Sequence, residues 1–166
     1  MEKIKPLSDV LRYRNDQLVL MFSRKKGISH FESLQLFEEL KKWLWFLAQR
    51  DANSKPFAVF PEQSVIDHYW HEFILSTKDY HAFCDLFFGR YIHHVPTPDG
   101  ILEDGSDFGV HNSLMEIDPG AFVQQKLDIL RESMREVARV LGVETVKIWY
   151  RELPAKYYFR TPKFTD

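Results

Sequence analysis

Apolar side chains recur every three or four residues along most of the chain, with polar or charged residues between them. This period places the apolar residues on one face of an α-helix. It predicts five helices, over about residues 8–27, 29–50, 62–75, 76–89 and 119–141. The second has the widest apolar stripe, formed by Leu36, Leu40, Trp43 and Leu47, so we expect it to be buried on two sides.

Capping residues and glycines support these helix ends. Ser-x-x-Glu and Ser-x-x-Asp sequences resemble capping boxes, and a glycine after the last apolar residue is a common helix stop. The predicted caps are Ser29 with Glu32 and Ser76 with Asp79, and the predicted stops are Gly27, Gly89 and Gly142. Residues 143–150 are richer in β-branched and aromatic side chains, which favours a short strand or extended arm. The predicted fold is therefore mainly α, an irregular bundle of about five helices with a short extended C-terminal arm.

The length of 166 residues fits a single domain, 1–166. Within it, residues 97–113 contain one proline, three glycines and four acidic side chains and lack a helical period. A loop of this length is either a connector or a lid over a site, and the sequence leaves both open.

The composition narrows the class of protein. Hydrophobic residues make up 45% and aromatic residues 15% of the chain, which is typical of a globular fold. Because 22 basic and 24 acidic residues give a net charge of -2, we do not expect nucleic acid as a partner. We also expect no membrane span, since no apolar run approaches about 20 residues. One cysteine and no signal-peptide pattern favour a soluble, cytoplasmic protein.

Candidate chemistry lies in one stretch, because five of the seven histidines and the one cysteine fall between residues 67 and 94. Asp67 and His71 are one helical turn apart and therefore share a helix face. Cys84 belongs to the inward stripe of the next helix, and His93, or His94 as its substitute, follows that helix. Oxygen, nitrogen and sulfur donors in one four-coordinate site suit zinc best, although iron and copper also accept them. We therefore predict a metal site made by Asp67, His71, Cys84 and His93.

Other interpretations use the same residues. In one, they form a buried polar network without metal, and the protein is an interaction module for an unknown protein partner. In another, an open coordination position makes the protein a metal-dependent hydrolase or oxidase. A third uses Cys84 as a nucleophile with a histidine base, but an inward position among aromatic residues disfavours the thiolate that this needs. His68 and His81 lie off the inward stripe and are expected on the surface.

The same stretch resembles the glycine-rich domain-containing protein-like family, a domain of unknown function. Its pattern is an aspartate, a Trp-His pair, then tyrosine, cysteine, glycine and a His-His-x-Pro close. This chain matches it at Asp67, Trp70, His71, Tyr80, Cys84, Gly89, His93, His94 and Pro96, within a family-like core of about residues 36–96. The resemblance implies that Trp70, Tyr80, Gly89 and Pro96 are structural signature positions. It implies no agreed activity, and the C-terminal helix and arm, about 119–166, lie beyond it.

Overall fold

The computed structural model describes residues 4–50, 57, 60, 63–94 and 118–158. Within these residues it contains helices and no strand, which confirms the mainly α prediction. Contacts divide the chain into two compact units, Met1–Asp51 with Ser64–Val95, and Ala52–Gln63 with Pro96–Asp166. That the whole chain forms one domain stays a prediction. None of the described helices is long and apolar enough to cross a membrane.

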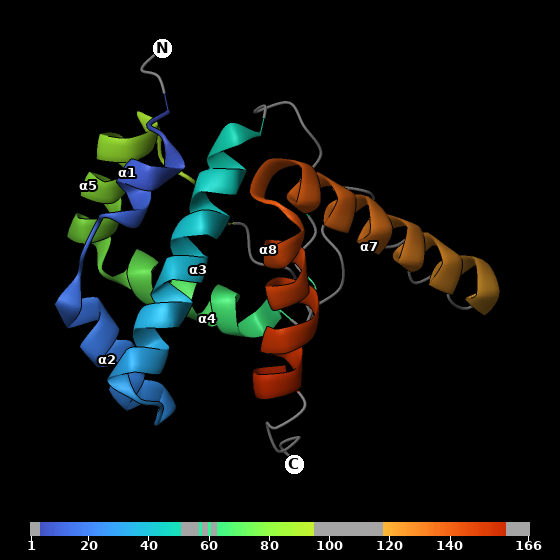
Figure 1. The fold of residues 1–166 in the computed structure, drawn as a ribbon, viewed down its shortest axis with the longest axis horizontal. Coiled ribbons are helices and arrows are strands. Elements are labelled where there is room, and N and C mark those ends of the chain that lie inside the picture. Colours follow the sequence, from blue (N-terminus) through green and yellow to red (C-terminus); the bar gives the residue numbers. More distant parts are fainter. Residues whose placement is uncertain (1–3, 51–56, 58–59, 61–62, 95–117, 159–166) are drawn as a thin grey trace. The chain divides into compact units, whose positions relative to one another are not determined.

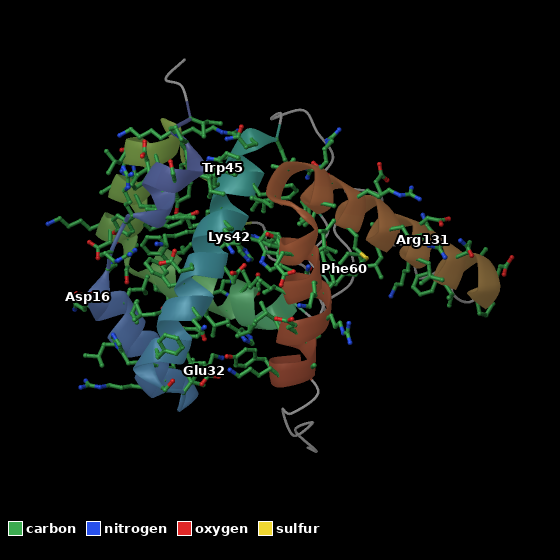
Figure 2. The ribbon with its side chains drawn as sticks, in the orientation of Figure 1. Asp16, Glu32, Lys42, Trp45, Phe60 and Arg131 are labelled. Carbon is green, nitrogen blue, oxygen red and sulfur yellow. The ribbon has the colours of Figure 1, made fainter. Side chains whose placement is uncertain are left out.

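The first unit is built around one long helix. Its helices are α1 (Leu7–Leu11), α2 (Asp16–Lys26), α3 (His30–Gln49), α4 (Ser64–Leu75) and α5 (Thr77–Phe88). α3 contacts α1, α2 and α4, and α4 in turn contacts α5 (Figure 1). The N-terminal segment is also held to α3, because the indole nitrogen of Trp45 donates to the carbonyl of Lys5 at 2.9 Å (Figure 2).

The prediction of one helix over residues 8–27 was wrong, because the chain forms α1 and α2 with a break between them. Asn15 caps α2, its side chain accepting from the Leu18 amide at 3.0 Å. The buried ammonium of Lys41 donates to the carbonyls of Leu11 and Tyr13 at 2.6 and 3.0 Å. These contacts satisfy backbone groups that a continuous helix would have paired internally, so the break is stable.

The predicted caps fared differently. Ser29 caps α3 as expected, accepting from the Glu32 amide at 3.1 Å. Ser76 precedes α5 but makes no side-chain cap hydrogen bond. Asp79 instead accepts from the side chain of Asn15 at 2.9 Å, which joins the start of α5 to the start of α2. Gly89 ends α5 as predicted with φ 62°, the left-handed conformation that favours glycine.

The second unit contains α7 (Pro119–Leu141), whose bounds agree with the prediction, and then α8 (Val143–Lys147). Two short π-helices follow, η3 (Ile148–Glu152) and η4 (Pro154–Tyr158). α8 turns back beside the end of α7 after Gly142 (Figure 1).

The strand or extended arm predicted over residues 143–150 was therefore wrong. The backbone over these residues is helical, in α8 and η3, and Lys147 pairs with Glu144 at 3.2 Å, one turn earlier, and with Glu152 at 3.1 Å. Because strand preference depends strongly on context, helical packing overrides the β-branched composition here. The loop 97–113, predicted as a connector or a lid, lies outside the described residues.

Candidate metal site

Helix α4 supplies two neighbouring donors. Asp67 lies in its first turn, and His71 follows one turn later. A distance of 3.5 Å separates the Nδ1 atom of His71 from the Oδ2 atom of Asp67. The side chain of Asp67 is 24% exposed and that of His71 45%, so both are reachable from solvent. The shared helix face predicted from the sequence is therefore present.

The third donor comes from the segment that follows α5. The Nε2 atom of His94 lies 2.7 Å from the Oδ1 atom of Asp67, and the His94 side chain is only 10% exposed. Its ring centroid lies 4.4 Å from that of His71 and 4.4 Å from that of Trp70. His94 thus reaches the exposed edge of α4 from a different part of the chain.

Asp67, His71 and His94 together form a group able to hold a metal ion. One donor atom from each residue lies within 4.8 Å of the donors of the other two. An ion with bond lengths near 2.1 Å can join donors that are at most about 4.2 Å apart. The two carboxylate–imidazole distances are within this limit, from His94 to Oδ1 and from His71 to Oδ2 of Asp67, whereas the 4.8 Å bound on all three donors is slightly above it.

Two of the four predicted ligands lie outside this group. Cys84 is fully buried in the core. The ring of His93 is exposed and lies 4.9 Å from that of Tyr91. The structure therefore brings together Asp67 and His71 with the substitute His94, and places neither Cys84 nor His93 among them.

The charges at the site favour an ionised carboxylate. Burial raises the pKa of Asp67, but its hydrogen bond with His94 and the nearby imidazoles of His71, His94 and His68 outweigh burial and lower it. Burial raises the pKa of the Cys84 thiol, so Cys84 stays protonated and lacks the thiolate of a nucleophile. The sequence expectation that disfavoured a cysteine nucleophile agrees with this environment.

His68, expected on the surface, is exposed beside the site. Its Nδ1 atom lies 3.3 Å from the Lys26 ammonium. Burial lowers its pKa, and the charge of Lys26 lowers it further, which favours a neutral imidazole. His68 does not belong to the three-donor group.

The aromatic signature residues connect α4, α5 and the segment that carries His94. The indole nitrogen of Trp70 donates to the Tyr80 hydroxyl at 2.9 Å. That hydroxyl donates to the carbonyl of Ile92 at 2.6 Å. From the sequence, both aromatic residues were predicted to be structural, but this hydrogen-bond network was not predicted. The one signal for it in the sequence was the place of both residues in the recurring pattern. Pro96, the remaining signature residue, lies outside the described residues.

A family comparison covers this whole region, because the model of the UCP032817-like family matches residues 9–108, more than half of the chain. The chain belongs to the UCP032817-like family. This family has no established function, and its match includes the three clustered donors and the signature residues. It agrees with the expected domain of unknown function but does not support the name glycine-rich domain-containing. No curated protein and no solved structure matches the chain significantly.

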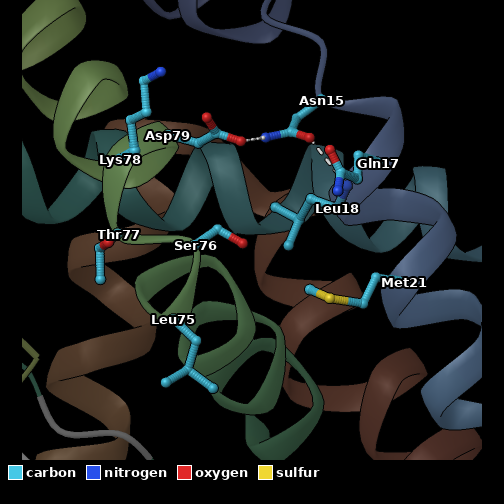
Figure 3. A pocket seen from close by; sticks show the side chains of 9 residues that line it. All are labelled: Asn15, Gln17, Leu18, Met21, Leu75, Ser76, Thr77, Lys78 and Asp79. Atoms are coloured by element: carbon cyan, nitrogen blue, oxygen red, sulfur yellow. Dashed lines mark hydrogen bonds between the residues drawn. The ribbon is translucent and has the colours of Figure 1, made fainter.

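A pocket elsewhere in the UCP032817-like chain contains none of the clustered donors. It has a volume of about 320 Å³ and is open to solvent. Residues from the start of α2 and from the junction of α4 with α5 line it, including Leu18, Met21, Leu75 and Asp79 (Figure 3). The Asn15–Asp79 hydrogen bond crosses one side of it. The donor cluster, rather than this pocket, brings reactive groups together.

Proposed function

We propose that this protein binds one divalent transition metal ion through Asp67, His71 and His94. The observation that carries the proposal is the convergence of the three donors, two from α4 and one from the segment after α5, within 4.8 Å of one another. The partial exposure of Asp67 and His71 gives an ion access to the donors. The ionised state of Asp67 supplies the negative charge that a divalent ion requires.

Two imidazoles and one carboxylate are the ligand set of open zinc sites and of non-haem iron(II) sites. We propose zinc as the preferred ion. Iron(II) is its competitor, since it accepts the same two imidazoles and one carboxylate and the cluster contains no thiolate. Three protein ligands leave at least one coordination position for water or a substrate, whereas structural zinc sites are usually closed by four. The donor set therefore suits a metal-dependent hydrolase or oxidase better than a purely structural site.

A protein-interaction module without metal is the second candidate. The observation that favours it is the 2.7 Å contact between His94 and Asp67, because the pair already satisfies both groups without an ion. In that case, the cluster acts only to hold the segment after α5 against α4.

Calorimetric titration with zinc distinguishes the two candidates. The protein is prepared without a histidine tag, stripped with a chelator and titrated with zinc and, separately, with anaerobic iron(II). We expect saturable binding of one ion per chain and a higher midpoint of thermal unfolding. At a free zinc concentration one hundred times Kd, the added stability is about 2.7 kcal/mol. Absence of saturable binding of either ion, with unfolding insensitive to chelator, would reject the metal site in favour of the interaction module.

Cobalt substitution then tests the ligand set. With two imidazoles and one carboxylate, the cobalt form has visible d–d bands and no thiolate-to-cobalt charge-transfer band in the near ultraviolet. A charge-transfer band that disappears in Cys84→Ala would restore Cys84 as a ligand and contradict the set proposed here.

A further inference from the structure

We infer that Tyr80 positions His94 by clamping the backbone of Ile92. The consequence for metal binding rests on the proposed function, but the positioning itself does not. Residues 91–94 belong to no helix or strand, so backbone hydrogen bonding within an element does not hold them. The location of His94 therefore depends on contacts that this segment makes with α4 and α5.

Ile92 is held from α5 by one side chain. The Tyr80 hydroxyl donates to its carbonyl at 2.6 Å. Tyr80 is completely buried, and Ile92 is nearly so. Buried hydrogen bonds have no competing water, and leaving one of these groups unpaired would be costly. The clamp therefore defines one position for the backbone two residues before His94.

Trp70 connects the clamp to α4. Its indole nitrogen donates to the Tyr80 hydroxyl at 2.9 Å, while the edge-on ring of His94 packs against its indole at 4.4 Å and 68°. One tryptophan thus contacts both the clamp and the ligand. Because Trp70 and His71 are adjacent in α4, this contact also places His94 beside the two other donors.

A simple packing role would require the ring of Tyr80 but not its hydroxyl. The ring makes edge contacts with Phe73 and Tyr91, each at 5.1 Å. The hydroxyl makes the two hydrogen bonds that join α4 to the Ile92 backbone. Tyr80→Phe therefore removes the clamp while keeping the packing, which separates the two roles.

Tyr69→Phe is the matched control. Tyr69 is also completely buried, and its hydroxyl lies 3.0 Å from the Ser33 hydroxyl, with no described bond to residues 91–94. Both variants lose a buried tyrosine hydroxyl. We expect Tyr80→Phe to weaken zinc binding roughly 10–100-fold, the usual effect of removing a group that orients a ligand, and Tyr69→Phe to leave it unchanged. Equal affinities in the wild type and Tyr80→Phe would overturn the inference.

A measurement without metal separates this inference from the proposed function. In the presence of chelator, the Trp70 ring current displaces the His94 ring-proton resonances from their values in an unstructured peptide. We expect this displacement to collapse in Tyr80→Phe and to persist in Tyr69→Phe. If the wild type binds no metal but the displacement collapses as expected, the proposed function fails and the positioning role stands. A displacement that is unchanged in Tyr80→Phe overturns the positioning role whatever the metal result.

Discussion

Two aspartate–histidine pairs in the first unit have the same spacing along a helix but different surroundings. Asp67 and His71 lie on α4, with 3.5 Å between their closest nitrogen and oxygen atoms. His81 and Asp85 lie on α5, with a distance of 3.0 Å. By pair distance alone, the α5 pair is the tighter of the two.

Their surroundings decide what each pair does. The α5 side chains are 66% and 59% exposed, and the described residues add no third donor to them. The α4 pair receives His94 from another segment and is more buried. Asp67 also lies in the first turn of its helix, where the helix dipole favours a carboxylate, whereas Asp85 lies near the end of α5. On the proposed function, a helical Asp–His spacing can bind a metal ion only where the fold adds another ligand.

Replacing the two aspartates should break this comparison most strongly. We expect Asp67→Asn to weaken zinc binding by more than about 100-fold, because it removes the charged ligand itself, while loss of an outer partner alone costs about 10–100-fold. Asp85→Asn makes the same substitution in the exposed pair and should leave the affinity for zinc unchanged. Calorimetric titration of both variants measures the difference. Equal affinity in the two variants would remove Asp67 from the ligand set.

The adjacent residues His93 and His94 sharpen the comparison, because they have the same side chain but only that of His94 is directed toward Asp67. We expect His94→Ala to weaken zinc binding by about 100-fold, the upper limit for loss of an outer partner, because it removes a neutral ligand while Asp67 and His71 stay bound to the ion. His93→Ala removes an exposed imidazole and should bind zinc as the wild type does. The same titration checks both variants. A weaker His93→Ala with an unaffected His94→Ala would favour the ligand set originally predicted from the sequence.

The contrast between the α4 residues and the two adjacent histidines also shows how far the sequence could predict the site. Asp67 and His71 lie in a helix, where a regular period determines which residues share a face. His93 and His94 lie outside any helix or strand, where no period determines direction. The hydrogen bond from Tyr80 to the carbonyl of Ile92 decides that direction, and no helical period predicts it. The sequence therefore predicted the two side chains on α4 that lie in the cluster, but preferred His93 and named His94 only as its substitute.

The fold shows the same division between regular and context-dependent features. The ends of α7 and the glycine stop of α5 follow from local chemistry and were predicted. The break between α1 and α2 depends partly on Lys41, which comes from a distant part of α3. Cys84 was correctly expected to face inward, but an inward stripe shared with aromatic residues placed it in the core rather than at the donor cluster. Periodicity predicts well which residues are buried, but it predicts poorly which residues from different segments lie close together.

The smallest expected effect is the coupling within each pair when no metal is present. Double-mutant cycles with Asp67→Asn and His94→Ala, and with Asp85→Asn and His81→Ala, isolate the pair terms in the free energy of unfolding. The 2.7 Å contact between His94 and Asp67 is mostly shielded from solvent, so we expect a coupling of about 1–2 kcal/mol. The exposed α5 pair should contribute below about 0.5 kcal/mol, because water and salt screen it. Chemical denaturation in chelator measures both couplings, and added salt should reduce the α5 term proportionally more. Equal couplings would mean that the His94–Asp67 contact is no stronger than the exposed α5 pair when no metal is bound. Any difference between the two pairs would then come from the metal alone.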